Sequence, residues 1–151
     1  MLKKFVHLYR RWRAMGNELG TVAPDDLAMV QEVLSSSEFG LWRAMSGTDQ
    51  AHSLQVLHIF EQLEPNSSPA EKSAALLHDV AKAISPMSRM ARSAATIGSF
   101  RRERWRWYRQ HEVMGVEALQ RIGSSQRTIE LISRRAQDAV ALNLYRADDS
   151  V

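Results

Sequence analysis

A histidine and an aspartate stand side by side in an apolar stretch near the middle of the chain, as His78 and Asp79 of ALLHDVAK (residues 75–82). On a helix, the neighbours of Asp79 are small or apolar, so its carboxylate has little access to water. A buried, ionised carboxylate is costly unless it is paired, hydrogen-bonded or bound to a cation. A divalent metal shared with His78 meets this need best.

A second histidine points toward the same interior. His52 shares one face of its predicted helix with Val56 and Ile59, at offsets of four and seven residues. A histidine on an apolar face is often only a structural residue, and a nearby metal site changes that interpretation. His58 and His7 lack such support, and we interpret both as structural.

The C-terminus offers a further carboxylate. In the last predicted helix an apolar stripe runs to Leu144, and Asp148 continues it four residues on. A carboxylate at the end of a core-facing stripe again requires a positive partner, which favours Asp148 over Asp149. That partner is either a metal ion or an arginine such as Arg146.

These segments together resemble the HD superfamily of metal-dependent phosphohydrolases. ALLHDVAK is similar to the family's His-Asp doublet, DQAHSLQV offers the early histidine and LYRADDSV the late aspartate, over roughly residues 40–151. The resemblance implies one divalent ion, of Mn, Fe, Mg, Co, Ni or Zn. Its implied ligands are His52, His78, Asp79 and Asp148.

The resemblance also implies a reaction, the hydrolysis of a phosphomonoester or phosphodiester, often a nucleotide, by metal-activated water. Asp79 is the ligand best placed to accept a proton from that water. Lys82 and His111 are the candidates for stabilising charge on the phosphate. His111 opens HEVMGVEAL, which looks like the segment after the doublet in many HD proteins. The resemblance leaves three roles for His111: to bind the substrate phosphate, to bind a second metal, or only to cap the helix.

One segment departs from the family pattern. LISRRAQD carries Arg134 and Arg135 where related proteins commonly have a histidine that helps to hold a second metal or the substrate. Arginine stays protonated and cannot ligate a cation. This predicts one metal rather than two, and it favours as an alternative an HD-fold ligand-binding or regulatory module without turnover.

A third class of function follows from the charge pattern. The chain has a formal net charge of +3, and its arginines concentrate in residues 1–15 and 85–110. In RRERWRWYRQ (residues 101–110) they alternate with aromatic residues that could stack on bases. This allows a basic nucleic-acid or membrane-surface binding protein. A solvated amphipathic turn is the favoured explanation of the segment, and nucleic acid is not the favoured partner.

The helical periodicity predicts an all-α, single-domain bundle of about six or seven helices. The resemblance implies that this bundle is of the HD type. The expected helices cover residues 2–15, 24–34, 38–47, 48–64, 69–85, 111–123 and 126–148. Thr48 or Asp49 is expected to cap the helix over residues 48–64. Ser68 and Glu71 are expected to form a capping box at the start of the helix over residues 69–85, which carries His78 and Asp79. Residues 1–37 are expected to form an N-terminal extension and residues 38–151 the HD core.

The composition sets outer bounds. The 151 residues contain no cysteine, and no apolar run reaches the roughly 18 to 20 residues of a membrane span. We therefore expect a soluble, cytoplasmic protein. The family resemblance, in turn, implies a small phosphorylated substrate as its partner. The sequence leaves its oligomeric state open.

Overall fold

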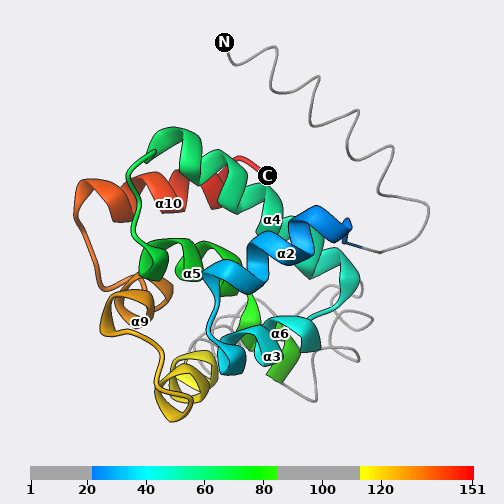
Figure 1. Ribbon diagram of the computed structural model, residues 1–151. Coiled ribbons are helices and arrows are strands. Elements are labelled where there is room, and N and C mark those ends of the chain that lie inside the picture. Colours follow the sequence, from blue (N-terminus) through cyan, green and yellow to red (C-terminus); the bar gives the residue numbers. More distant parts are fainter. Residues whose placement is uncertain (1–21, 85–112) are drawn as a thin grey trace, which may run out of the picture.

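A computed structural model describes residues 22–84 and 113–151. The described residues form eight helical segments and no strand, which confirms the all-α class (Figure 1). The segments, labelled as in Figure 1, are α2 (Pro24–Val33), α3 (Ser36–Ala44), α4 (Gly47–Leu63), α5 (Pro69–Leu77), α6 (Val80–Ile84), residues 113–121, α9 (Gln126–Ile132) and α10 (Ala139–Asp149). The expected helix over residues 2–15 and the RRERWRWYRQ segment lie outside the described residues.

Most helix starts follow from local sequence. The Ser35, Ser68 and Ser125 hydroxyls and the Asp138 carboxylate each accept a backbone N–H in the first turn of their helices. The capping box of Ser68 and Glu71 is present as expected. The predicted cap of α4 was wrong, because Ser46 caps this helix by accepting the Asp49 N–H, and the helix therefore begins at Gly47.

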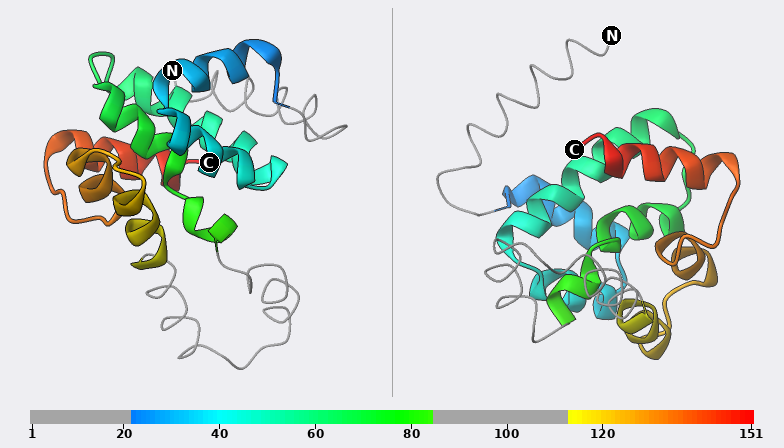
Figure 2. Two further views of the ribbon diagram at one scale, coloured as in Figure 1. Left: turned by 60° about the horizontal axis from the view of Figure 1, so that its bottom comes forward. Right: turned by 180° about the vertical axis from the view of Figure 1, so that it is seen from behind.

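Helix α5 is the centre of the packing, as its apolar sequence predicts. Residues 73–77 are all buried, and α5 contacts α2, α3, α4 and α9. Helix α10 packs along α4 on the other side of the molecule from α3 and α6 (Figures 1 and 2). This arrangement brings the middle of α4, the end of α5 and the end of α10 to one place.

The helix expected over residues 69–85 is divided. Helix α5 ends at Leu77, His78 and Asp79 form a turn, and α6 begins at Val80. His78 itself has right-handed helical angles (φ −57°, ψ −31°). The interruption between the two helices is therefore confined to His78 and Asp79. Neither proline nor glycine occurs at this break. Helix α6 instead packs against α3 and against residues 113–121, and we attribute its direction to these contacts.

Gly115 allows the last of these contacts. It is buried, and a Cβ atom at this position would lie only 3.1 Å from the Ala81 Cβ. A side chain here would push the 113–121 helix away from α6. The same helix ends at Gly123, whose φ of +75° is the left-handed conformation that glycine adopts readily, and this confirms the predicted end.

The helix expected over residues 126–148 is also divided, into α9 and α10. Arg134 has a positive φ of 53°, which ends α9, and the Asp138 cap then starts α10 in a new direction. Because two predicted helices are each divided, the number of described helices slightly exceeds the six or seven expected.

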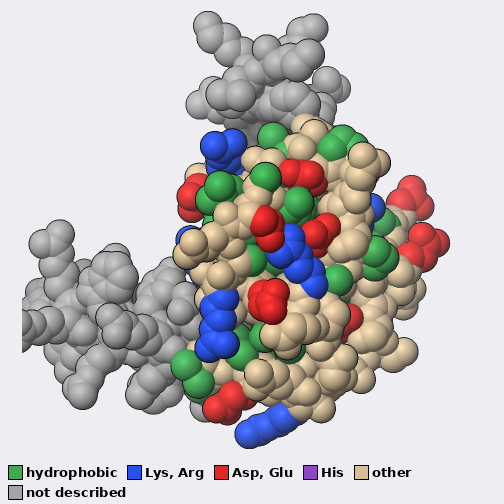
Figure 3. Space-filling view, turned by 90° about the vertical axis from the view of Figure 1, so that its left-hand side faces the viewer, with side chains coloured by type: hydrophobic (Ala, Val, Ile, Leu, Met, Phe, Trp, Pro, Cys, Tyr) green, Lys and Arg blue, Asp and Glu red, His purple; other side chains and the backbone are tan. Residues whose placement is uncertain are grey.

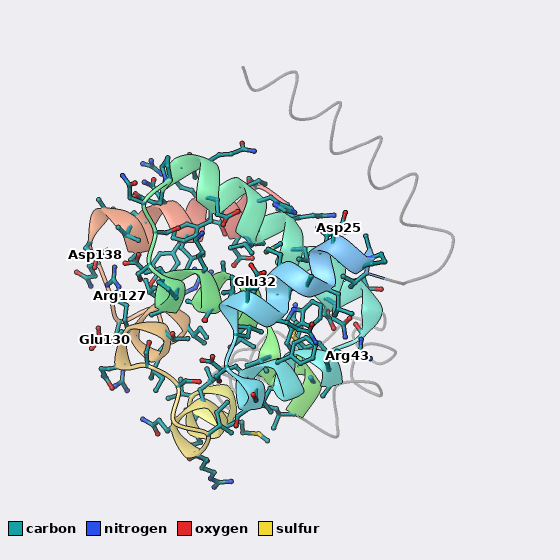
Figure 4. The ribbon with its side chains drawn as sticks, in the orientation of Figure 1. Asp25, Glu32, Arg43, Arg127, Glu130 and Asp138 are labelled. Carbon is teal, nitrogen blue, oxygen red and sulfur yellow. The ribbon has the colours of Figure 1, made fainter. Side chains whose placement is uncertain are left out.

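An ionic network ties α5, α9 and α10 together at this turn. The Arg127 guanidinium donates to Glu71 Oε1 (3.0 and 3.1 Å) and to both oxygens of Asp138 (2.6 and 3.0 Å). Arg127 and Asp138 lie beside each other at the edge of the molecule (Figure 4). On this side of the molecule acidic and basic side chains are neighbours (Figure 3).

The network depresses the pKa of both acids. Hydrogen bonds from Arg127 and the Ala141 backbone lower the pKa of Asp138 from 3.8 to about 2. Partial burial alone would raise the pKa of Glu71, but hydrogen bonds from Ser68 and Arg127 outweigh it and lower this pKa below 4.5. The folded state thus binds these protons less tightly than the unfolded state, and the stability from the network is complete above about pH 4.5 and is lost toward pH 2.

We therefore expect Arg127→Met to lower the free energy of unfolding at pH 7 by about 1–3 kcal/mol, because Glu71 loses its charged partner. The difference from wild type should shrink steadily between pH 4.5 and 2.5. Urea denaturation at several pH values measures this. Arg121→Met, which removes an exposed arginine, is the control and should change stability by less than about 0.5 kcal/mol; a pH-independent loss in Arg127→Met would contradict the prediction.

Candidate metal centre

Three helices each contribute one side chain to a compact cluster. His52 comes from α4, His78 from the end of α5 and Asp148 from the last turn of α10. Asp148 Oδ1 lies 3.5 Å from His52 Nε2 and 3.3 Å from His78 Nε2. The ligand atoms of the three residues all lie within 4.8 Å of one another, close enough to share one metal ion.

His78 presents an unused nitrogen to this cluster. Its Nδ1 lies 2.8 Å from the Ala75 carbonyl oxygen, and because a carbonyl can only accept, Nδ1 carries the proton. Its buried Nε2 has no hydrogen-bond partner among the described residues. This orients the free lone pair of the neutral imidazole toward Asp148, which is how a histidine that ligates a metal is usually held.

The cluster attracts positive charge. Burial alone would lower the pKa of His78, but contact with Asp148 and the negative charge of Asp79 outweigh it, so its pKa is raised above 6.5. Contacts with His52 and His78 hold the pKa of Asp148 well below its ordinary value. Without a metal, the arrangement therefore favours a protonated His78 imidazole beside an ionised Asp148 carboxylate, and a divalent cation would take the place of that proton.

Asp79 lies beside the cluster and has a different partner. Its Oδ2 is 3.5 Å from His78 Nε2 and 3.9 Å from His52 Nε2, so it adjoins both imidazoles. The same oxygen accepts a hydrogen bond from Lys82 Nζ at 2.6 Å. Asp79 is not one of the three residues whose ligand atoms all lie within 4.8 Å of one another.

The second oxygen of Asp148 has a different partner from the first. Arg134 Nη2 donates to Asp148 Oδ2 at 3.1 Å, and its guanidinium also lies 5.0 Å from the centre of the Tyr145 ring. Arg146, expected from the sequence as an alternative partner, donates to Asn143 instead. Asp148 thus pairs with an arginine through one oxygen, which is one of the two alternatives that the sequence allowed, and contacts the two imidazoles through the other.

The remaining sequence candidates lie elsewhere. His58 is half exposed on α4 and its Nε2 is 3.8 Å from Asp26 Oδ1, so it stands apart from the cluster. Asp149 is exposed at the end of α10. His111 lies outside the described residues. Sequence reasoning missed the Arg134–Asp148 pair, whose partners are 14 positions apart and on different elements.

The donor set fits a metal ion chemically. Two imidazole nitrogens and a carboxylate oxygen suit several divalent transition metals, and mixed ligands of this kind do not select one of them. The three side chains are only partly exposed, at 28% for His52, 12% for His78 and 27% for Asp148, which leaves one side accessible to a ligand.

A family model described as HD domain matches residues 50–149. This range contains all three residues of the cluster and about two-thirds of the chain. The protein belongs to the HD domain family. Its members are typically metal-dependent hydrolases, in agreement with a histidine and aspartate cluster that could hold a metal.

Other comparisons add no relative. No curated protein and no solved structure shows significant similarity to the chain. Within the described residues, no helix is both long enough and apolar enough to cross a membrane. The HD family match and the geometry of the cluster are therefore the observations that bear on function.

The neighbouring aspartates Asp148 and Asp149 provide a matched test of the centre. We expect Mn²⁺ or Zn²⁺ at about a hundredfold above its Kd to raise the Tm of the wild type by roughly 5–10 °C, since a ligand of the folded state stabilises it. Asp148→Asn should abolish most of this shift, and Asp149→Asn should retain it. Differential scanning fluorimetry with and without metal measures the effect, and equal shifts in both variants would exclude Asp148 as a ligand.

Proposed function

We propose that the protein is a metal-dependent phosphohydrolase that cleaves a phosphomonoester or phosphodiester, with nucleotides among the candidate substrates. The observation that carries this proposal is the convergence of His52, His78 and Asp148 within 4.8 Å inside an HD domain. Asp149, the alternative to Asp148, is exposed at the end of α10, and His58, interpreted from the sequence as structural, stands apart from this point.

The proposed ligands are His52, His78, Asp79 and Asp148 on one divalent ion. Asp79 would join the other three by a small side-chain rotation, because its Oδ2 already lies 3.5 Å from His78 Nε2. When bound, such an ion lowers the pKa of a coordinated water and polarises a phosphoryl oxygen. Its identity among Mn, Fe, Mg, Co, Ni and Zn is not decided by these ligand types.

The chain's own residues would supply the proton transfer and the charge. Asp79 is the proposed acceptor of the proton from water, since a carboxylate beside the ion is within reach of that water. Lys82 is 43% exposed and held at Asp79, where its ammonium can approach a phosphoryl oxygen without leaving the site. His111 keeps its proposed role in binding phosphate.

We also propose that the whole chain forms a single domain. Helix α2 belongs to the predicted N-terminal extension, yet Val30 and Leu34 are buried in the same core cluster as Leu54 and Leu76. An extension that shares its core with the family domain is expected to unfold together with it.

A second candidate function is a ligand-binding or regulatory module without turnover. The observation that favours it is the position of Arg134, which occupies one oxygen of Asp148 and cannot itself ligate a metal. A metal-loaded protein that hydrolyses none of a broad panel of phosphate esters would support this candidate. The third, a basic surface-binding protein, depends on segments outside the described residues.

Two histidines of α4 provide a matched test of the hydrolase proposal, because His52 lies in the cluster and His58 lies outside it. In an assay with p-nitrophenyl phosphate, bis-p-nitrophenyl phosphate and nucleotides in the presence of Mn²⁺, we expect His52→Ala to lower kcat/KM by about a hundredfold or more, since a lost ligand should cost at least as much as a lost supporting contact. His58→Ala, on the same helix but apart from the cluster, should stay within about twofold.

Elemental analysis of the same preparations separates the outcomes. About one metal per chain in the wild type and in His58→Ala, with loss in His52→Ala, is the expected result. A wild type that binds no metal and hydrolyses no ester would overturn the proposal. Equal activity in both variants would place the reaction away from this cluster.

A further inference from the structure

Arg134 adopts a backbone conformation that its residue type disfavours. Its φ is 53°, and among the described residues it is the one non-glycine position with a positive φ. The turn around it has the hydrogen bonds of a helix end, with the Arg134 and Arg135 N–H groups donating to Leu131 and Glu130 carbonyls. Glycine or asparagine normally occupies such a position, because a Cβ atom is strained there. Strain of this kind often accompanies a functional role of the side chain.

The strained turn places the Arg134 side chain at the metal centre. Its Nη2 donates to Asp148 Oδ2, whereas the two imidazoles contact the other carboxylate oxygen, Oδ1. The guanidinium lies over the Tyr145 ring at 5.0 Å. Tyr145 in turn donates its hydroxyl to the Leu131 and Ala136 carbonyls, on both sides of the turn. The position of the guanidinium is therefore fixed from two directions.

Most of the Arg134 donors remain available. A guanidinium has five N–H donors, and within the described part of the chain Arg134 gives one hydrogen bond, to Asp148. Its side chain is 52% exposed. Arg127 offers the contrast, because all three of its guanidinium nitrogens donate to Glu71 or Asp138 and it serves to hold helices together. Arg134 is held by Asp148 and Tyr145, yet within the described residues it uses only one of its N–H donors, and its side chain is half exposed.

We propose that Arg134 is the anion-binding residue of this centre, and that its free N–H groups receive the phosphoryl oxygens of a substrate bound at the adjacent metal. The proposal rests on the proposed function and adds to it a residue that selects for an anionic substrate group. A planar, permanently charged guanidinium binds phosphate in a bidentate manner, which an imidazole at this position would not do. Asp148 links the two functions, with one oxygen on each side.

The test is the affinity for inorganic phosphate, measured by isothermal titration calorimetry on Mn²⁺-loaded and on metal-free full-length protein. The variants are Arg134→Asn, Arg134→Lys and the matched control Arg135→Asn, which removes the same charge from the neighbouring exposed residue. Asparagine tolerates a positive φ, so Arg134→Asn should fold with an unchanged or raised Tm.

We expect Arg134→Asn to retain one metal per chain and to lower phosphate affinity by about ten- to hundredfold, the loss of one or two charged hydrogen bonds. Arg134→Lys should lose less, and Arg135→Asn should stay within about twofold of the wild type.

Three results would overturn the inference. Unchanged phosphate affinity in Arg134→Asn, with metal bound, would exclude Arg134 as the anion site and leave the proposed function intact. Loss of metal in Arg134→Asn would show that this residue only positions Asp148. A wild type that binds neither metal nor phosphate would overturn both proposals. A wild type that takes up no metal but binds phosphate through Arg134 would support the inference and count against the hydrolase.

Discussion

The contact of one carboxylate oxygen with two imidazoles is the constraint on which the arrangement of the site depends. Asp148 Oδ1 lies within 3.5 Å of His52 Nε2 and His78 Nε2, and these residues come from α10, α4 and α5. Polar groups at a buried helix junction are unfavourable unless they compensate one another. The junction is thus held by the same atoms that could hold a metal, and hydrophobic packing of α5 against α4 fixes the distance between them.

The site carries its own counter-charges. Lys82 binds Asp79 on one side and Arg134 binds Asp148 on the other, so each carboxylate has a cation besides the imidazoles. These cations lower the electrostatic free energy of placing two negatively charged carboxylates close together. They also weaken the attraction of the site for a further cation, and the same charges favour an anionic ligand beside it. Under the proposed function, these charges would hold a phosphate group beside the bound metal.

The turn between α9 and α10 has two structural functions. Arg127 connects it to α5 through Glu71, and Arg134 connects it to the end of α10 through Asp148. The first arginine is largely enclosed by its partners, and the second is half exposed. Identical residues seven positions apart therefore have different roles, which follow from how many of their donors the protein itself uses.

Local sequence determined the helix starts, the helical class and the identity of the central helix. Serine caps, the Ser68–Glu71 box and the apolar run of residues 74–77 are local signals, and their energetics involve neighbours within one or two turns. The candidate ligands were also identified from residue types and helical faces, together with a family resemblance. His52 and Asp148 needed only the correct period to be placed on inward faces.

Only the tertiary structure decided the break at the doublet, the backbone conformation of Arg134 and the pairing of the carboxylates. The chain leaves α5 at the His78–Asp79 turn without a proline or glycine, because contacts with α3 and the 113–121 helix set the course of α6. Arg134 takes a positive φ that its residue type does not favour, and this brings it to a partner 14 residues away. Such features depend on contacts between elements distant in sequence, whose free energies outweigh local preference and leave no mark in the local pattern.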